Sequence, residues 1–166
     1  FVMALPLLAA AEIPWTVDAT REDSGVTIQD VTYMSDGLRI KAILFDGGQP
    51  GERPGLVFNH GGVSGISKDM VRRSTDLARA GYVVLTPAYR GEGGSEGHIE
   101  VAAGEVNDIL AAADLLRGLP RVDHRRIGLV GSSHGALISV LAAARDHKVR
   151  AVAAACGVMN TEAWYR

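Results

Sequence analysis

Short apolar runs alternate with amphipathic stretches along this chain, and that alternation limits the folds it can adopt more than any other feature. The runs have the length and continuous apolar character of strands buried on both faces of a parallel sheet, and they lie at 56–58, 82–85, 127–130 and 149–155. The stretches between them are typical of helices and lie at 69–80, 101–116 and 133–145. Strand–helix units repeated in this way predict an α/β fold, a mostly parallel sheet with helices on both faces.

An antiparallel hairpin is predicted ahead of this alternation. Residues 26–33 and 38–45 both have strand character, and the second run alternates apolar residues with Arg39 and Lys41, so one of its faces is expected in water. The turn residues between the two runs, 35–37, have the sequence Ser-Asp-Gly, which is a hairpin signal.

The helix predicted at 101–116 carries a clear apolar stripe: Ala102, Val106, Ile109, Leu110, Ala113 and Leu116. Glu105, Asp108 and Arg117 lie off this stripe. We interpret Asp108 and Asp114 as charges on the surface of this helix or in its packing.

Length and composition predict a single domain. The chain has 166 residues, enough for one core and too few for two ordinary domains.

Residues 1–11 resemble the apolar and cleavage regions of a secretory signal peptide, with Ala9 and Ala11 at the small positions. We therefore expect a signal-peptide remnant at 1–11, a leader segment at 12–25 and the domain at 26–166. A remnant predicts a secreted or periplasmic protein, whereas an apolar segment packed on the domain would leave the protein cytoplasmic.

Charge and cysteine content narrow the classes of partner. The net charge of −2 gives no electrostatic reason to expect nucleic acid or an anionic membrane surface. No apolar stretch is long enough for a transmembrane helix, so stable membrane insertion is not expected. Cys156, the one cysteine, cannot form an internal disulfide, and its small apolar neighbours predict a buried thiol. The sequence leaves the oligomeric state open.

The strongest chemical signal is Gly131-Ser132-Ser133-His134-Gly135, which joins a predicted strand to a predicted helix. A Gly-x-Ser-x-Gly sequence in this setting is a nucleophile elbow, in which the serine stands exposed on a strained turn. The turn crowds its flanks, so Gly131 and Gly135 occupy positions where a Cβ would not fit. Ser133 is therefore the predicted nucleophile, and the alternative is a tight turn with a buried small hydroxyl.

Other motifs are weaker or absent. The same pattern recurs at 93–97 with no strand before it and no helix directly after it, so we interpret Ser95 as a loop residue. Neither the dinucleotide-binding nor the phosphate-loop glycine pattern is satisfied. The five histidines do not occur at the spacings that metal-binding motifs require; they are His60, His98, His124, His134 and His147. The sequence predicts no metal and no cofactor.

Acyl-transfer chemistry needs at least two donors aimed at a developing oxyanion. The backbone N–H of His134, directly after the serine, is the first candidate. His60-Gly61-Gly62 follows the strand at 56–58 and lets the backbone approach a substrate, so the Gly62 N–H is the second. The alternative for this sequence is a plain turn. His134 is expected to act through its backbone, because a side chain next to the serine points away from it.

Three motifs in order resemble the α/β-hydrolase superfamily, and within it the prolyl-oligopeptidase-like and dienelactone-hydrolase-like branches; they lie at 59–62, 89–97 and 122–135. The resemblance covers residues 26–160. It implies Ser133 as nucleophile, the N–H groups of Gly62 and His134 as oxyanion hole, and a pocket-forming loop at 89–91. The implied activity is hydrolysis of a small ester, or of a peptide or amide bond in a short peptide, through an acyl-enzyme.

The resemblance also implies an acid and then a histidine after Ser133. In the superfamily both follow later strands, so we expect them beyond residue 166 and expect 26–166 to be an incomplete α/β-hydrolase domain, the N-terminal two-thirds of the fold. His147 lies in the wrong place for this role. Such a fragment is expected to be nearly inactive by itself. The alternative is a non-catalytic binding or interaction protein on the same scaffold; a nucleotide-binding domain would fit the sheet but lacks its phosphate loop.

Overall fold

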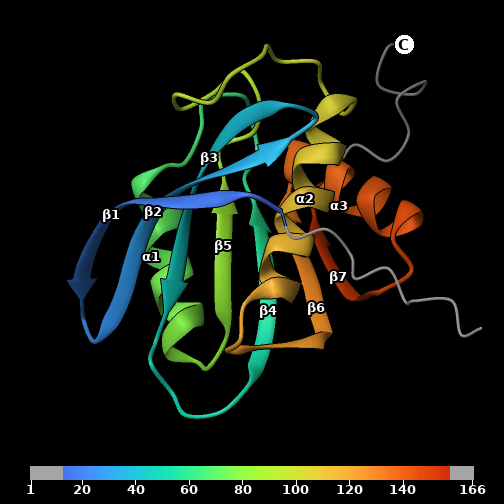
Figure 1. The fold of residues 1–166 in the computed structure, drawn as a ribbon. Helices are drawn as coiled ribbons and strands as arrows, with labels where there is room; N and C mark the ends of the chain where they lie inside the picture. The colour runs from blue at the N-terminus through green and yellow to red at the C-terminus, as the bar shows by residue number, and fades with distance from the viewer. Residues whose placement is uncertain (1–12, 158–166) are drawn as a thin grey trace, which may run out of the picture.

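A seven-stranded mixed sheet runs through the computed structural model, which describes residues 13–157 (Figure 1). Its strands are β1 (Trp15–Asp23), β2 (Val26–Ser35), β3 (Leu38–Asp46), β4 (Arg53–Asn59), β5 (Val83–Pro87), β6 (Val122–Ser132) and β7 (Val149–Ala155). The strand order is β1-β2-β3-β5-β4-β6-β7, with antiparallel pairs from β1 to β5 and parallel pairs from β5 to β7. The predicted α/β fold and its antiparallel N-terminal hairpin are confirmed.

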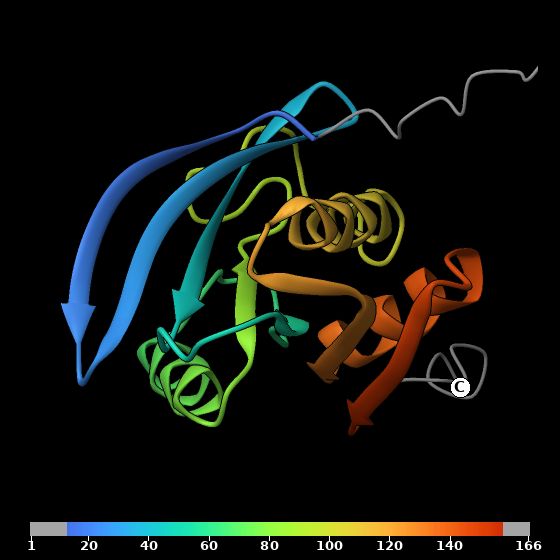
Figure 2. The ribbon, with the colours of Figure 1, turned by 60° about the horizontal axis from the view of Figure 1, so that its bottom comes forward.

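Helices cover both faces of this sheet, as predicted. Helix α1 (Lys68–Arg79) packs against β3 and β5, while α2 (Gly104–Gly118) and α3 (His134–Arg145) pack against each other and against β6. Successive side chains of β4 point to opposite faces, so Val57 belongs to the core cluster under α2 and α3 and Phe58 packs on the cluster under α1. Figure 2 shows the twist of the sheet, from the long curved β1–β2 ribbon to β7 at the opposite edge.

Strand β1 corrects the predicted leader segment at 12–25. Residues 15–23 pair antiparallel with β2 from Trp15↔Tyr33 to Asp23↔Val26, so the sheet begins before residue 26. All of β1 is exposed, and polar pairs such as Arg21–Asp30 at 2.9 Å link it to β2. Trp15, Val17 and Ala19 alternate with polar residues in the first part of β1, which is the strand signal that the sequence offers for this segment. The predicted signal-peptide remnant at 1–11 lies outside the described residues.

Helix α2 starts later than predicted and buries two acids, Glu105 and Asp108, that lie off its predicted apolar stripe. Val101 and Ala102 have φ angles of 56° and 68°, which end any helical path before Gly104. Glu105 is fully buried because its carboxylate accepts the N–H groups of Glu100, Val101 and Ala103, which act as a cap for the loop before the helix.

Asp108 is also fully buried. Its carboxylate faces Arg90, which belongs to the loop after β5. The carboxylate accepts the Arg90 backbone N–H at 2.9 Å and its Nη2 at 2.8 Å, and Arg90 itself is only 5% exposed. Of the two interpretations of Asp108, a surface charge and a charge in the helix packing, the structure supports the second. Its charge is compensated by a residue 18 positions away, and this ion pair joins the loop after β5 to α2.

Strand β7 and Cys156 are exposed, although the sequence predicted burial for both. β7 is the edge of the described sheet, and none of its residues is buried. The residues that the structure describes place no helix over the α1-side face of β6 and β7, so Ala153, Ala155 and the Cys156 thiol remain accessible. Within residues 13–157, no helix is both long and apolar enough to cross a lipid bilayer.

Candidate active site

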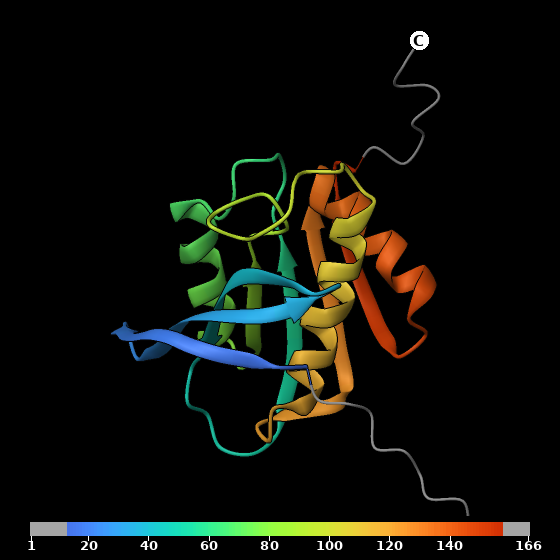
Figure 3. The ribbon, with the colours of Figure 1, turned by 45° about the horizontal axis from the view of Figure 1, so that its top comes forward.

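The connections of β4 and β6 create a crevice at one edge of the sheet. These neighbouring strands run parallel, but the chain leaves β4 towards α1 on one face and leaves β6 towards α3 on the other. Connections that diverge in this way open a crevice at the carboxyl ends of the strands, where α/β proteins bind their ligands. Figure 3 shows the loops after β4 and β5 arching over this edge.

Ser133 stands at the turn between β6 and α3 with a strained backbone. Its φ of 51° and ψ of −118° lie far from the regions that a side chain prefers, and the residue is exposed. The Ser133 N–H donates to the Ala155 carbonyl at 2.9 Å, which ties the turn to the end of β7. This is the geometry of a nucleophile elbow.

The glycines on either side of the serine lie where main chains nearly touch. A Cβ on Gly131 would lie 2.2 Å from the Gly135 oxygen, and one on Gly135 would lie 2.3 Å from the Asn59 oxygen. Both contacts are with backbone, which has little freedom to move away. The elbow therefore packs directly on the carboxyl end of β4.

We expect Gly135→Ala to destabilise the protein by about 1–3 kcal/mol and to displace Ser133, because the added methyl must push β4 and α3 apart. Urea unfolding measures the loss of stability. Gly118→Ala is the matched control: Gly118 is an exposed helical glycine with no atom within 4 Å of the position that an added methyl would take, and alanine there should be neutral or stabilising. Equal unfolding free energies for the two variants would contradict the close-packing argument.

Asn59 and Ser139 form a buried link that the sequence did not reveal. The Asn59 Nδ2 donates to the Ser139 Oγ at 2.8 Å, and the Ser139 hydroxyl donates to the Gly135 carbonyl at 2.6 Å. The two side chains are 80 positions apart, so only the folded topology brings them together. The link joins the end of β4 to the first turn of α3 and so supports the elbow from behind.

The two predicted oxyanion donors lie on the loops that meet at the elbow. A Cβ on Gly61 would lie 3.2 Å from the Ser133 Cβ, so the loop after β4 passes beside the serine. Within the described part of the chain, neither the Gly62 N–H nor the His134 N–H donates a hydrogen bond to another residue. Both donors are therefore free to bind an acceptor that reaches the crevice.

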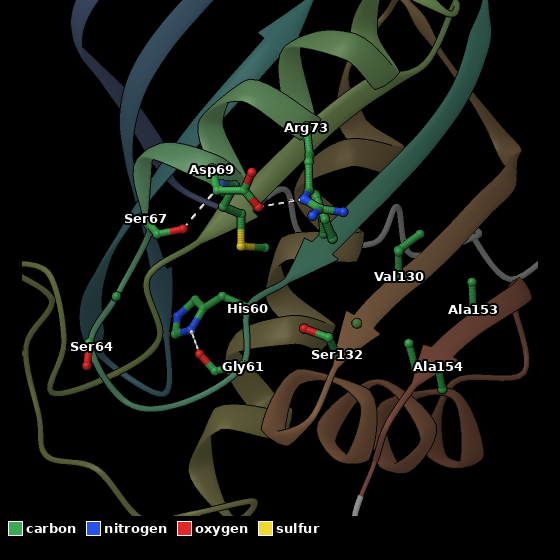
Figure 4. A pocket seen from close by; sticks show the side chains of 15 residues that line it. His60, Gly61, Ser64, Ser67, Asp69, Arg73, Val130, Ser132, Ala153 and Ala154 are labelled. Carbon is green, nitrogen blue, oxygen red and sulfur yellow. Dashed lines mark hydrogen bonds and ion pairs between the residues drawn. The ribbon is translucent and has the colours of Figure 1, made fainter.

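An open hollow of about 760 Å³ lies next to the elbow (Figure 4). Its wall includes Gly61 and Ser64 from the loop after β4, Met70 and Arg73 from α1, and Ser132 from the end of β6. Its floor is the α1-side face of the sheet, formed by Phe58, Val130 and Ala153. Ser133 is not part of this lining, but its neighbour Ser132 is. The hollow thus pairs an apolar floor with a polar wall next to the proposed reaction centre.

A cluster of ionisable side chains is buried behind the loop after β4. The His60 ring stacks on Tyr89 with centroids 4.1 Å apart, and its Nε2 lies 3.2 Å from the Glu92 Oε2. Burial lowers the pKa of His60 and raises the pKa of the Glu92 carboxyl. Burial, and then the nearby Glu92, raise the pKa of Tyr89 well above its usual value, so its phenol remains a donor. The Tyr89 and His134 rings are arranged in a T shape, with their centroids 5.8 Å apart.

The structure brings Ser133, Gly131, Gly135, Gly62 and His134 together at one edge of the sheet. Sequence reasoning missed the His134 side chain, whose Nδ1 lies 3.2 Å from the Gly62 carbonyl oxygen.

Ser95 belongs to the second copy of the Gly-x-Ser-x-Gly pattern, at 93–97. The Ser95 hydroxyl accepts the Lys41 N–H and donates to the Ala88 carbonyl, so it stabilises the loop after β5.

Between residues 13 and 157, no group of three or more His, Cys, Asp or Glu side chains could hold a metal ion.

Comparison with known proteins identifies the family. The family model described as X-Pro dipeptidyl-peptidase (S15 family) matches residues 7–166. The chain belongs to this family. Among curated relatives, the uncharacterized peptidase YtmA of Bacillus subtilis (strain 168) is 33% identical over 118 residues, 71% of this chain and 46% of that protein. The S15 chain thus spans about half the length of the curated relative it matches.

Solved structures show the same fold. Acetyl xylan esterase 1 from Thermoanaerobacterium sp. JW/SL YS485 matches with a TM-score of 0.70 at 22% identity, over 87% of this chain and 52% of that one. The α/β-hydrolase GrgF from Penicillium sp. sh18 matches with a TM-score of 0.73 at 25% identity, over 80% of this chain and 47% of that one. The α/β-hydrolase superfamily and fold are confirmed, and the S15 chain is placed in a hydrolase family. The narrower resemblance to the prolyl-oligopeptidase and dienelactone-hydrolase branches stays a prediction.

Proposed function

We propose that this chain supplies the nucleophile and the oxyanion hole of a serine hydrolase that works through an acyl-enzyme. The observation that carries the proposal is Ser133, an exposed serine at a strained φ of 51°, together with the Gly62 and His134 N–H groups, which donate to no other residue between 13 and 157. Backbone strain of this kind costs about 1–3 kcal/mol and persists where it serves a function. A purely structural turn would gain stability by relaxing it.

In the proposed reaction, the Ser133 Oγ attacks the carbonyl carbon of the substrate and its proton passes to a histidine. The carbonyl oxygen becomes an oxyanion, which accepts hydrogen bonds from the N–H groups of Gly62 and His134. The dipole at the N-terminus of α3 favours the same negative charge. Collapse expels the protonated leaving group and leaves an acyl-serine, which water then hydrolyses. We propose that the histidine and the acid that orients it lie beyond residue 166.

The proposed substrates are small esters or short peptides. The S15 family is described by a peptidase activity, while the acetyl xylan esterase shares the fold, and the same acyl-transfer centre serves both classes of bond. An ester is the preferred substrate in this proposal, with a peptide or amide bond as the alternative.

A fluorophosphonate probe tests the proposal on the full-length protein that contains this sequence. We expect one covalent adduct on the tryptic peptide 127–145, localised by fragmentation to Ser133 and not to Ser132 or Ser139. The Ser133→Ala variant should acquire no adduct there. A folded full-length protein that stays unlabelled, and that hydrolyses no ester or peptide in a panel, would reject the proposal and favour a non-catalytic interaction protein.

A further inference from the structure

The loop at 60–67, which carries the proposed donor Gly62, has little intrinsic stiffness. Three of its residues are Gly61, Gly62 and Gly65, and the last two adopt φ angles of 71° and 74°. The loop lies between β4 and α1 and belongs to neither. Glycine adds conformational freedom that folding must remove, so something outside the loop has to fix its path.

Three side chains hydrogen-bond to the backbone of this loop, two from the loop after β5 and one from the first residue of α3. The Tyr89 hydroxyl donates to the His60 carbonyl at 3.0 Å, and His134 Nδ1 contacts the Gly62 carbonyl at 3.2 Å. Glu92 Oε2 accepts the Gly65 N–H at 2.7 Å. We call Tyr89, Glu92 and His134 the loop-holding residues.

The first two contacts lie on either side of the peptide group that contains the Gly62 N–H. The His60 carbonyl belongs to the peptide before it, and the Gly62 carbonyl belongs to the peptide after it. Because a carbonyl can only accept, the second contact requires a proton on His134 Nδ1. With both neighbouring peptides held, the Gly62 N–H has little freedom to turn away from the crevice.

Burial of the Glu92 carboxyl is energetically unfavourable at this position. Its side chain is 2% exposed, and its Oε1 has no hydrogen-bond partner among the described residues. Burying a carboxyl with an unpaired oxygen costs free energy that an apolar side chain would not. Its hydrogen bond among the described residues accepts the Gly65 N–H, and its Oε2 lies 3.2 Å from the His60 Nε2, so both neighbours belong to the loop at 60–67. The placement therefore serves that loop.

We propose that Glu92 is a positioning residue, which together with Tyr89 and His134 holds the Gly62 N–H where an oxyanion forms. The proposal rests on the proposed function, because it assigns a purpose to the Gly62 donor. Glu92 acts only through the loop and does not touch the substrate. Its loss should weaken transition-state binding more than ground-state binding.

Steady-state kinetics on the full-length protein with a chromogenic acyl ester test this role. We expect Glu92→Ala to lower kcat about 10- to 100-fold with KM changed less than about threefold, since a displaced oxyanion donor is missed only in the transition state. Glu92→Gln keeps an oxygen acceptor for the Gly65 N–H and should recover most of kcat. The affinity of a boronic acid that forms a tetrahedral adduct should fall in parallel with kcat.

The matched control is Glu96→Ala on the same loop. The Glu96 side chain is 40% exposed, and among the described residues its carboxylate hydrogen-bonds only to Arg39, so kcat should stay within about twofold of the wild-type value. Unchanged kcat in Glu92→Ala would overturn the proposal. So would a Glu92→Gln variant as impaired as Glu92→Ala, because that result would make the charge, and not the acceptor, essential.

Hydrogen exchange separates this proposal from the proposed function. Glu92→Ala should speed amide exchange at 61–66 at least tenfold over Glu96→Ala, with little change in β4 and β6. This readout needs no catalytic activity. Faster exchange in a protein that never labels at Ser133 would reject the serine-hydrolase proposal and the catalytic purpose of the loop, while unchanged exchange in an active enzyme would reject the role of Glu92 alone.

Discussion

Replacing Ser133 by alanine in the full-length protein is expected to lower kcat for an acyl ester by about 10⁴- to 10⁶-fold. The substitution removes the atom that would form the proposed acyl-enzyme and leaves only the modest rate enhancement of the proposed oxyanion hole. The measurement is steady-state hydrolysis of a chromogenic ester, with thermal unfolding as a check of folding. Alanine keeps the short side chain at an exposed position, so the variant should remain folded.

The chain provides its own control in the second copy of the Gly-x-Ser-x-Gly pattern. Ser95→Ala removes a hydroxyl that joins Lys41 to Ala88, so it should cost about 1 kcal/mol of stability. Its kcat should remain within about threefold of wild type, because Ser95 lies in a loop with no strand directly before it and no helix directly after it. Loss of activity in Ser95→Ala with retention in Ser133→Ala would reverse the assignment.

The local part of the candidate site was predictable because a short sequence determines it. The elbow needs a strand, two glycines, a serine and a helix in succession, and all of them are adjacent along the chain. The close approach of Gly131 to Gly135 is a property of the same five residues. The periodicity of the apolar residues likewise predicted α1, α3 and the strands from β2 to β7.

The long-range part of the site was not predictable from one sequence. Glu92 and Gly65 are 27 positions apart and Asn59 and Ser139 are 80 apart, so no local pattern signals either contact. In α2, periodicity could not decide whether Asp108 is a surface charge or a charge in the helix packing. An acid can be buried when a cation from elsewhere meets it, and the cation here is Arg90 in a glycine-rich loop. The sequence signal for this burial was a charged residue near the apolar stripe of the predicted helix.

Asp108→Ala is expected to lower the free energy of unfolding by about 3–5 kcal/mol, the cost of leaving a buried charge without its partner. Asp108 is fully buried and accepts three donors of Arg90: its backbone N–H, Nε and Nη2. Asp36 and Glu100 also contact the guanidinium but are more exposed, so they compensate only part of the loss. Urea unfolding of the full-length protein measures the change.

Asp114→Ala on the same helix is the matched control. Asp114 is exposed and pairs with Arg117, which keeps Asp146 as a second partner, so its loss should cost less than about 1 kcal/mol. Similar unfolding free energies for the two variants would contradict a dominant Arg90–Asp108 pair. Arg90 lies directly after Tyr89 and two residues before Glu92, so the same ion pair fixes the loop whose side chains hold Gly62. Asp108→Ala should therefore also accelerate amide exchange at 61–66, which links the stability of α2 to the geometry of the oxyanion donor.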